Sequence, residues 1–223
     1  MRVNWFLILA CILASLWAWQ QDTAFVEQNL VFSRNNLLVG HVWTIITALF
    51  VHANTAHLFG NMLFLFVFGN TLEKRIGRKN HLIVFFTGGL TAFIGSLFFF
   101  PPDTGMLGAS AAIFTLAAGV MLISPLKFSW LFLAPQGLVA ILYFAYNAII
   151  VASPVLRNNF GYDPNVAYIA HIIGFLVGVP FGIAWSPQWK KNLLITLVLF
   201  GIYLVIITVL GVFIGLKTPF GVF

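Results

Sequence analysis

The sequence has 223 residues, of which 61% are hydrophobic and only 7% are charged, and its mean hydropathy is +1.01. So few charged side chains cannot cover a water-facing surface, which excludes an ordinary soluble globular protein. The strongest cluster behind the net charge of +6 is four basic residues in a short loop, so we expect contacts with the lipid bilayer and none with nucleic acid.

Apolar stretches recur along the chain and are candidates to cross a hydrocarbon core of about 30 Å, which takes about 20 helical residues. They lie at about 4–20, 57–73, 81–100, 107–124, 128–152, 166–185 and 193–215. The strand alternation of a membrane barrel is absent, and spanning helices satisfy their backbone hydrogen bonds internally. We therefore predict an all-α fold, a polytopic membrane helical bundle in one domain over 1–223, with a core of about 1–186 and an extra helix at about 193–215.

The first apolar stretch follows Arg2 and has two interpretations. It is either a secretory signal peptide or a retained first helix. No convincing small-x-small cleavage site precedes Gln20, which favours the retained helix. Cys11 in this stretch is the only cysteine of the chain, so an intrachain disulfide is impossible.

The distribution of Lys and Arg indicates the orientation of the bundle, because basic residues favour the cytoplasmic side. If seven spans alternate, eight basic residues fall on one side and three on the other. The eight are Arg2, Lys74, Arg75, Arg78, Lys79, Lys127, Lys190 and Lys191. We therefore predict an integral, multi-pass protein of the cell membrane, with a cytoplasmic amino terminus and an outer carboxy terminus.

Ser110 and His171 lie in stretches apolar enough for the membrane interior, where polar side chains are unfavourable and often functional. In the predicted orientation both lie near the outer ends of their spans. His57 and Asn61 begin the second span at the same end and, being four residues apart, share a helical face. Four polar side chains from three helices therefore converge on one depth.

Helix packing is an alternative explanation for each of these residues. Ser110 stands among small residues, and His171 is followed by Gly174 and Gly178, which are both patterns typical of close helix contacts. The shared depth favours chemistry instead, because a histidine can take the proton of a serine hydroxyl and make it a nucleophile.

The chemistry indicated by these residues is acyl transfer. The backbone N–H of Ser110 and the side chains of His57 and Asn61 are candidate donors to the oxyanion that forms in such a reaction. No Asp or Glu lies in the fourth, fifth or sixth predicted span to orient His171. The sequence therefore predicts a Ser–His dyad rather than a triad.

Four short motifs stand in order along the chain. Residues 50–61 hold two histidines five apart and an asparagine four beyond the second, and residues 69–77 end the same span. Gly108-Ala109-Ser110 surrounds the serine, and residues 170–178 hold His171 with its glycines. Together, over about residues 40–186, these motifs strongly resemble the rhomboid family of intramembrane serine proteases.

The resemblance implies a role for each matching residue. Ser110 would be the nucleophile, and His171 the general base and then the general acid. His57 and Asn61 would stabilise the oxyanion, and His52 would support them. The family also implies a six-helix core, which together with the seventh span gives the prokaryotic type, and it implies no metal or other cofactor.

Three more residues belong to these motifs as supporting positions: Gly108, Phe114 and Gly174. The family often has tyrosine where Phe114 stands, and we expect the Phe114 ring to pack on His171. The family usually has glycine directly after the nucleophile, and this chain has Ala111. We expect the Ala111 methyl to crowd the sixth helix or to shift the oxyanion geometry, which would lower the efficiency of the reaction without changing its mechanism.

The loop at 153–164 is rich in Pro, Gly and Asn, as mobile loops are. By the resemblance it would cap the site, and the fifth span would act as a lateral gate for the substrate. Asp163 lies eight residues from His171, more than two helical turns, which makes it a poor third member of the site.

The predicted reaction is hydrolysis of a peptide bond in or near the transmembrane helix of a membrane-protein substrate. Two other classes stay open. The chain is alternatively a catalytically inactive rhomboid-like protein that binds transmembrane helices, a reading supported by Ala111. It is otherwise a haem or metal carrier with His57 and His171 as ligands.

Overall fold

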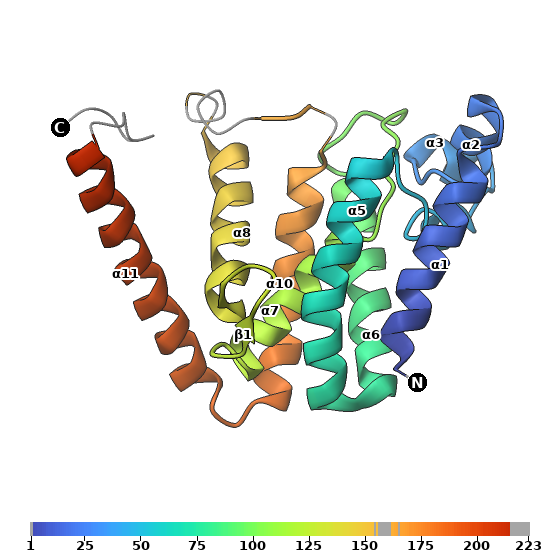
Figure 1. The fold of residues 1–223 in the computed structure, drawn as a ribbon. Coiled ribbons are helices and arrows are strands. Elements are labelled where there is room, and N and C mark those ends of the chain that lie inside the picture. Colours follow the sequence, from blue (N-terminus) through green and yellow to red (C-terminus); the bar gives the residue numbers. More distant parts are fainter. Residues whose placement is uncertain (1, 154, 156–161, 165, 215–223) are drawn as a thin grey trace.

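The computed structural model describes residues 2–153, 155, 162–164 and 166–214. Its elements are α1 (Val3–Ala18), α2 (Thr23–Asn29), α3 (Arg34–Leu38), α4 (Thr44–Thr47), α5 (Thr55–Phe64), η1 (Leu65–Gly69), α6 (Asn70–Ser96), α7 (Ser110–Ile123), β1 (Phe128–Ser129), β2 (Ala134–Pro135), α8 (Gln136–Ala152), α10 (Tyr168–Trp185) and α11 (Trp189–Ile214). The two short strands pair as an antiparallel hairpin, and the long helices form a bundle (Figure 1). The predicted all-α fold is confirmed.

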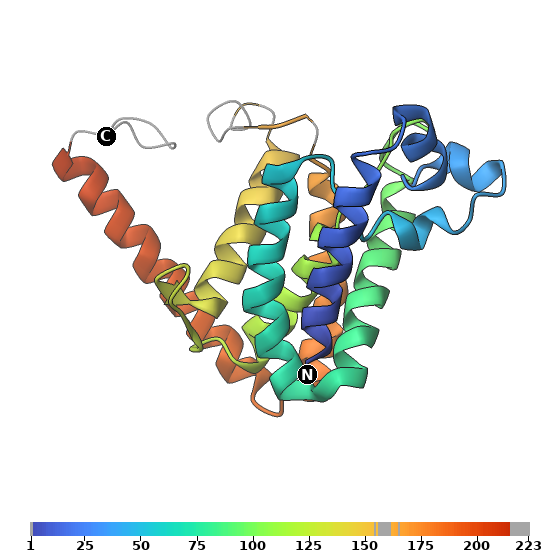
Figure 2. The same ribbon diagram turned by 45° about the vertical axis from the view of Figure 1, so that its right-hand side comes forward.

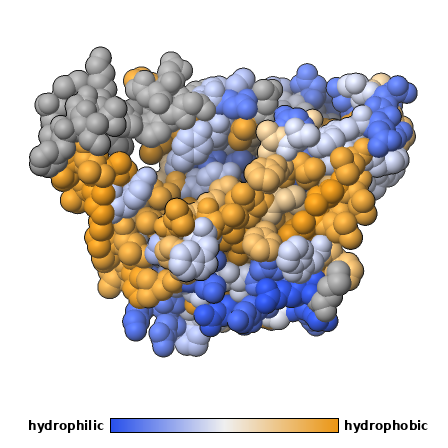
Figure 3. All heavy atoms as spheres, in the orientation of Figure 1, coloured by the Kyte–Doolittle hydropathy of each residue, from blue (hydrophilic) through white to orange (hydrophobic). Residues whose placement is uncertain are grey.

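Three helical segments are long and apolar enough to cross a membrane by length and composition. They are Thr55–Ser96, Tyr168–Trp185 and Trp189–Gly211. The first of them supplies two of the predicted spans, because Gly77 at its kink has φ +82° and ψ 168°. The apolar helices α1, α7 and α8 are shorter, with 16, 14 and 17 residues. An apolar band crosses the visible face of the molecule between more hydrophilic edges (Figure 3).

Two helices begin later than the sequence predicts. The fourth span was expected from residue 107, but α7 begins at Ser110, because Gly108 before it has a left-handed φ of +108°. The fifth was expected from residue 128, but residues 128–135 form the hairpin and α8 begins at Gln136. Apolar composition indicates which residues lie in the membrane. It does not indicate where within them the helix begins, because an apolar turn or hairpin has the same composition as an apolar helix.

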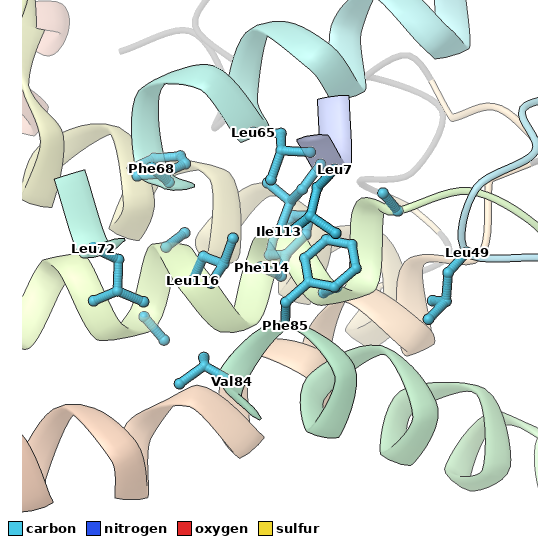
Figure 4. Close-up of a cluster of buried hydrophobic side chains, with 14 of the residues drawn as sticks. Leu7, Leu49, Leu65, Phe68, Leu72, Val84, Phe85, Ile113, Phe114 and Leu116 are labelled. Atoms are coloured by element: carbon cyan, nitrogen blue, oxygen red, sulfur yellow. The ribbon is translucent and has the colours of Figure 1, made fainter. Parts of the chain in front are cut away.

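Helix α7 is the centre of the bundle. Every residue from Ala111 to Leu122 is buried, and α7 contacts α5, α6, α8, α10 and α11. Figures 1 and 2 show it enclosed by its neighbours from both directions of view. Phe85 and Val84 of α6 and Leu65 near the end of α5 pack around its side chains, as Figure 4 shows.

The closest helix pair is α7 with α10, and glycines make its close approach possible. A Cβ on Gly174 would lie 2.2 Å from the carbonyl oxygen of Ala111, and one on Gly178 would lie 2.3 Å from that of Thr115. The Thr115 hydroxyl crosses the interface and donates to the Gly174 carbonyl at 2.7 Å. Small residues and interhelical hydrogen bonds are the usual basis of helix association in lipid.

A carboxylate fastens α1 to the rest of the bundle. Glu73 accepts from the backbone N–H groups of Val3 (2.8 Å) and Asn4 (2.9 Å) at the first turn of α1. This contact satisfies two unpaired donors and places negative charge at the positive end of a helix dipole. The Asn4 amide in turn donates to the Leu65 carbonyl at 3.0 Å, where the π-helical turn η1 begins.

The α7–α10 interface yields a stability prediction. We expect Gly178→Ala to destabilise the fold by about 1–3 kcal/mol, because its methyl collides with the backbone of α7. Thermal unfolding in mild detergent measures the change. The matched control is Gly201→Ala in α11, where a Cβ meets nothing within 4 Å. Equal unfolding temperatures for the two variants would contradict the close packing described.

Candidate active site

Ser110 is the first residue of α7 and follows a turn that only glycine adopts easily. Gly108 has φ +108°, and a Cβ there would lie 2.8 Å from both Cε1 and Nε2 of His57. The N–H of Gly108 donates to the carbonyl of Ala48 at 2.7 Å, which anchors the turn. The turn therefore brings the His57 ring beside the start of α7, next to Ser110.

His171 lies within hydrogen-bonding distance of Ser110. Its Nε2 atom is 2.8 Å from Ser110 Oγ, and its side chain is nearly buried. The Phe114 ring stacks on the imidazole with centroids 4.6 Å apart and planes inclined by 11°, as the sequence predicts. The structure thus brings the predicted Ser–His pair together from α7 and α10.

Asn147 of α8 is a neighbour of His171 that the sequence analysis missed. Its Oδ1 atom lies 2.8 Å from His171 Nδ1, and the side chain is 1% exposed. The predicted dyad therefore has a third polar side chain, a neutral amide rather than a carboxylate. A signal was present, because an asparagine inside a long apolar stretch needs a hydrogen-bond partner.

A cavity of about 180 Å³ opens beside Ser110. It is lined by Ala56, His57, Gly60, Asn61, Phe64, Ser110, Ile113, Phe114 and Tyr143. His57 and Asn61 therefore share one cavity with the serine, as their helical spacing predicts. Within the described residues, the backbone N–H of Ser110 has no hydrogen-bond acceptor, since α7 has no side-chain cap.

The two predicted oxyanion side chains have different local partners. His57 Nδ1 accepts a long bond of 3.5 Å from the Ala53 N–H, which leaves Nε2 as the protonated nitrogen of a neutral ring. The Asn61 Nδ2 group donates to the His57 carbonyl at 2.9 Å. An amide NH₂ has two hydrogens, so the second hydrogen of Asn61 is open to another acceptor.

His52 supports this site from behind the cavity. Its Nδ1 atom lies 3.1 Å from Ser15 Oγ on α1, and its Nε2 atom accepts a long bond of 3.4 Å from the Ala109 N–H. Burial, with a smaller contribution from the neighbouring His57, which disfavours a second positive charge, lowers the pKa of His52 to about 3. His52 is therefore a neutral side chain that links α1 to the residue before Ser110.

The residue after the serine fits its surroundings. Ala111 is buried in a small cluster with Ala92 of α6 and Ala170 of α10. Its methyl packs against α10, the sixth predicted span, and the expected crowding does not separate Ser110 from His171, which are in contact with that methyl in place. The structure has room for a small side chain where the rhomboid pattern has glycine.

The predicted cap over the site falls mostly on residues 154 and 156–161, which lie outside the described residues. In the described part, the Asp163 N–H donates to the Tyr168 hydroxyl at 3.0 Å, and the two rings of Tyr162 and Tyr168 stack. The Nδ1 partner of His171 is Asn147, so the structure agrees with the exclusion of Asp163 as the third member.

A family model described as Rhomboid domain matches residues 39–188, which is most of the chain and includes every site residue named above. The chain belongs to the rhomboid family. The resemblance seen in the four sequence motifs is confirmed, and with its apolar helices this rhomboid is an integral membrane protein.

Rhomboid relatives come from distant organisms. Rhomboid-like protease 3 of Toxoplasma gondii is 30% identical over 68% of this chain and 57% of its own length. Rhomboid-like protein 11, chloroplastic, of Arabidopsis thaliana is 30% identical over 60% of this chain and 49% of its own. Rhomboid protease GluP of Bacillus subtilis is 28% identical over 72% of this chain and 30% of its own. The alignments thus span less than two thirds of each relative.

The buried His52 makes the stability of this rhomboid depend on pH. Because the fold lowers the His52 pKa to about 3, only the unfolded chain binds this proton as the pH falls below about 6.5. We expect His52 to reduce the unfolding free energy by up to about 1.4 kcal/mol per pH unit between those values.

Denaturant unfolding in detergent at pH 6.5, 5.5 and 4.5 measures this dependence. The His52→Gln variant is the control, because it lacks the titrating ring while other groups are unchanged. Its unfolding free energy should fall less steeply with decreasing pH. Identical slopes for the two proteins would show that His52 is not held neutral by the fold.

Proposed function

We propose that this protein is an intramembrane serine protease that hydrolyses a peptide bond in or near the transmembrane helix of a membrane-protein substrate. The observation that carries the proposal is the 2.8 Å contact between Ser110 Oγ and His171 Nε2 beside a cavity inside an apolar bundle. A serine is a weak nucleophile unless a base takes its proton, and this contact places a base on it.

The geometry supports a two-step acyl transfer. Ser110 Oγ attacks the substrate carbonyl carbon as its proton passes to His171 Nε2, and the carbonyl oxygen becomes an oxyanion. His171 then gives the proton to the amine that leaves. A water molecule repeats the sequence on the acyl-enzyme, again with His171 as base and acid, and frees Ser110.

The start of α7 is suited to the oxyanion. The Ser110 N–H is unpaired among the described residues, and the positive end of the α7 dipole lies at the same point. His57 and Asn61 add side-chain donors from α5, which lines the same cavity. Fixed donors in a water-poor site stabilise developing charge far better than water does, which is the role we assign to these three groups.

Access for a substrate helix lies between α5 and α8. The Phe64 ring of α5 stacks on the Tyr143 ring of α8, with centroids 4.6 Å apart and planes at 8°, and both rings line the cavity. Parting these rings would admit a segment from the lipid. The segment must first unwind to expose a carbonyl, so we propose substrates weakened by Gly or Pro, with a small residue before the cut.

The cell membrane is the proposed location, with the amino terminus in the cytoplasm. The basic segment at 74–79, at the α6 kink, and the α10–α11 connection lie at the same edge of the bundle, the lower edge of Figure 1, which is strongly hydrophilic in Figure 3. Basic residues favour the cytoplasmic side, so the site faces outward.

The haem or metal carrier is the less favoured class. Both ring nitrogens of His171 have protein partners, Ser110 and Asn147, so neither is free to bind a metal. A helix-binding protein without catalysis is the alternative that the next experiment separates from the protease.

Removing the serine hydroxyl tests the proposal. Ser110→Ala in liposomes should reduce cleavage of a transmembrane substrate by about 10³-fold or more and abolish labelling by a fluorophosphonate. The control is Ser96→Ala, whose hydroxyl donates only to its own helix at Ala92 and which should keep both activities. A folded wild-type protein that neither cuts nor labels would favour the non-catalytic helix binder.

Shortening Phe64 tests the access route. We expect Phe64→Ala to raise the cleavage rate of a transmembrane substrate several-fold and to change little for a short water-soluble peptide, because only the former must part α5 from α8. The control is Phe59→Ala on the same helix, a ring that is 71% exposed. A rate that falls for both substrates would mean that Phe64 binds the substrate rather than obstructs it.

A further inference from the structure

We propose that Asn147 is a positioning residue that fixes the tautomer of His171, so that the site works as a Ser–His–Asn arrangement. The inference deepens the proposed function and rests on it. Sequence reasoning left His171 without an orienting partner, and the structure supplies one from α8, a helix that carries neither of the two reacting side chains.

The hydrogen bonds of Asn147 fix which way its amide points. One terminal atom lies 2.7 Å from the Tyr143 carbonyl oxygen, which can only accept, so that atom is the nitrogen Nδ2. The other terminal atom is therefore the oxygen Oδ1, and it lies 2.8 Å from His171 Nδ1. The orientation of the Asn147 amide therefore follows from the Tyr143 carbonyl, which is an acceptor only.

The amide orientation then determines the protonation of the ring. Oδ1 can only accept, so a favourable contact requires the hydrogen on His171 Nδ1. In a neutral imidazole this leaves the lone pair on Nε2, directed at Ser110 Oγ 2.8 Å away. The opposite tautomer would place two oxygen lone pairs against the Nδ1 lone pair and would prevent Nε2 from taking the serine proton.

Aromatic neighbours also restrain the His171 ring. They limit its tilting, which leaves rotation of the ring as the motion that Asn147 restricts. Phe114 stacks on one face of the imidazole, and Tyr168 meets it edge-on with centroids 6.4 Å apart. These contacts restrict tilting. Rotation about the ring axis, which would exchange nitrogen and carbon positions, is opposed by the bond to Asn147.

A neutral partner suits the position of this site. A buried carboxylate would require strong compensation inside an apolar bundle, whereas an amide satisfies its own hydrogen bonds to Tyr143 and His171. The titratable groups that interact with His171 are His57 on α5 and Tyr168 on α10, and Asp163 acts on His57 while its N–H donates to the Tyr168 hydroxyl. The two ring nitrogens of His171 are bonded to Asn147 and Ser110, which are both neutral side chains.

Two variants separate positioning from simple packing. Asn147→Leu keeps the branched shape of the side chain, is somewhat larger and has no acceptor, and we expect kcat to fall on the order of 10²-fold with KM within about twofold. Asn147→Asp keeps the acceptor and adds a charge that favours protonated His171. We expect it to move the acid limb of the kcat/KM profile to higher pH by about one unit or more.

Asn80→Leu is the matched control. Asn80 is a half-buried asparagine whose amide donates to the carbonyl four residues earlier, at Ile76, as Asn147 donates at Tyr143, but no histidine among the described residues bonds to it. It should leave kcat, KM and the pH profile unchanged. An Asn147→Leu protein with normal kcat, or an Asn147→Asp protein without a shifted acid limb, would overturn the proposal.

A measurement that needs no catalysis completes the test. In ¹⁵N-histidine spectra of the wild type, with the His171 signals assigned by their loss in His171→Gln, Nδ1 should be protonated and Nε2 should not. Asn147→Leu should lose this preference. An inactive wild type with the expected tautomer would refute the protease and keep the positioning role, whereas the opposite tautomer in an active protein would refute Asn147 alone.

Discussion

The close contact of α7 with α10 is the constraint on which the rest of the structure depends. Lipid gives helices no hydrophobic reason to associate, so the interface relies on the near-touching backbones at Gly174 and Gly178 and on the Thr115 hydrogen bond across it. Ser110 and His171 lie at one end of this interface. A shift of one helix by the width of a methyl group would therefore separate the reacting atoms, which makes the glycines part of the chemistry as well as of the packing.

Hydrogen bonds between uncharged groups also hold the bundle together. Amides and hydroxyls, among them Asn4, Ser15 and Asn147, connect separate segments of a bundle that has few charged side chains. The buried carboxylate Glu73 stands at a helix end, where backbone donors compensate it. A site built in this medium has reason to use an uncharged partner for its histidine, because each ion taken from water needs several compensating contacts.

The sequence was sufficient for the class of fold, the order of the helices and the convergence of Ser110, His171, His57 and Asn61. The length of an apolar stretch and the position of a polar residue within it are both visible in the sequence, and they determine the number of helices and the depth of each polar side chain. The late start of α7 at Ser110, the hairpin before Gln136 and the contact of Asn147 with His171 were not predicted. The first two are places where an apolar chain leaves the helix, which hydropathy does not mark, and the third depends on how α8 and α10 are rotated toward one another.

The shortness of α7 has a consequence for how such a site can change. Its 14 residues extend about 21 Å, less than a hydrocarbon core of about 30 Å, so the helix cannot reach both surfaces of a membrane. The number of residues between Ile123 and Ser110 therefore fixes two things: the position of Ser110 along the helix axis and the direction in which its side chain points around that axis. One residue inserted within it would turn the hydroxyl by about 100° away from His171, so only length-preserving changes keep the pair in register.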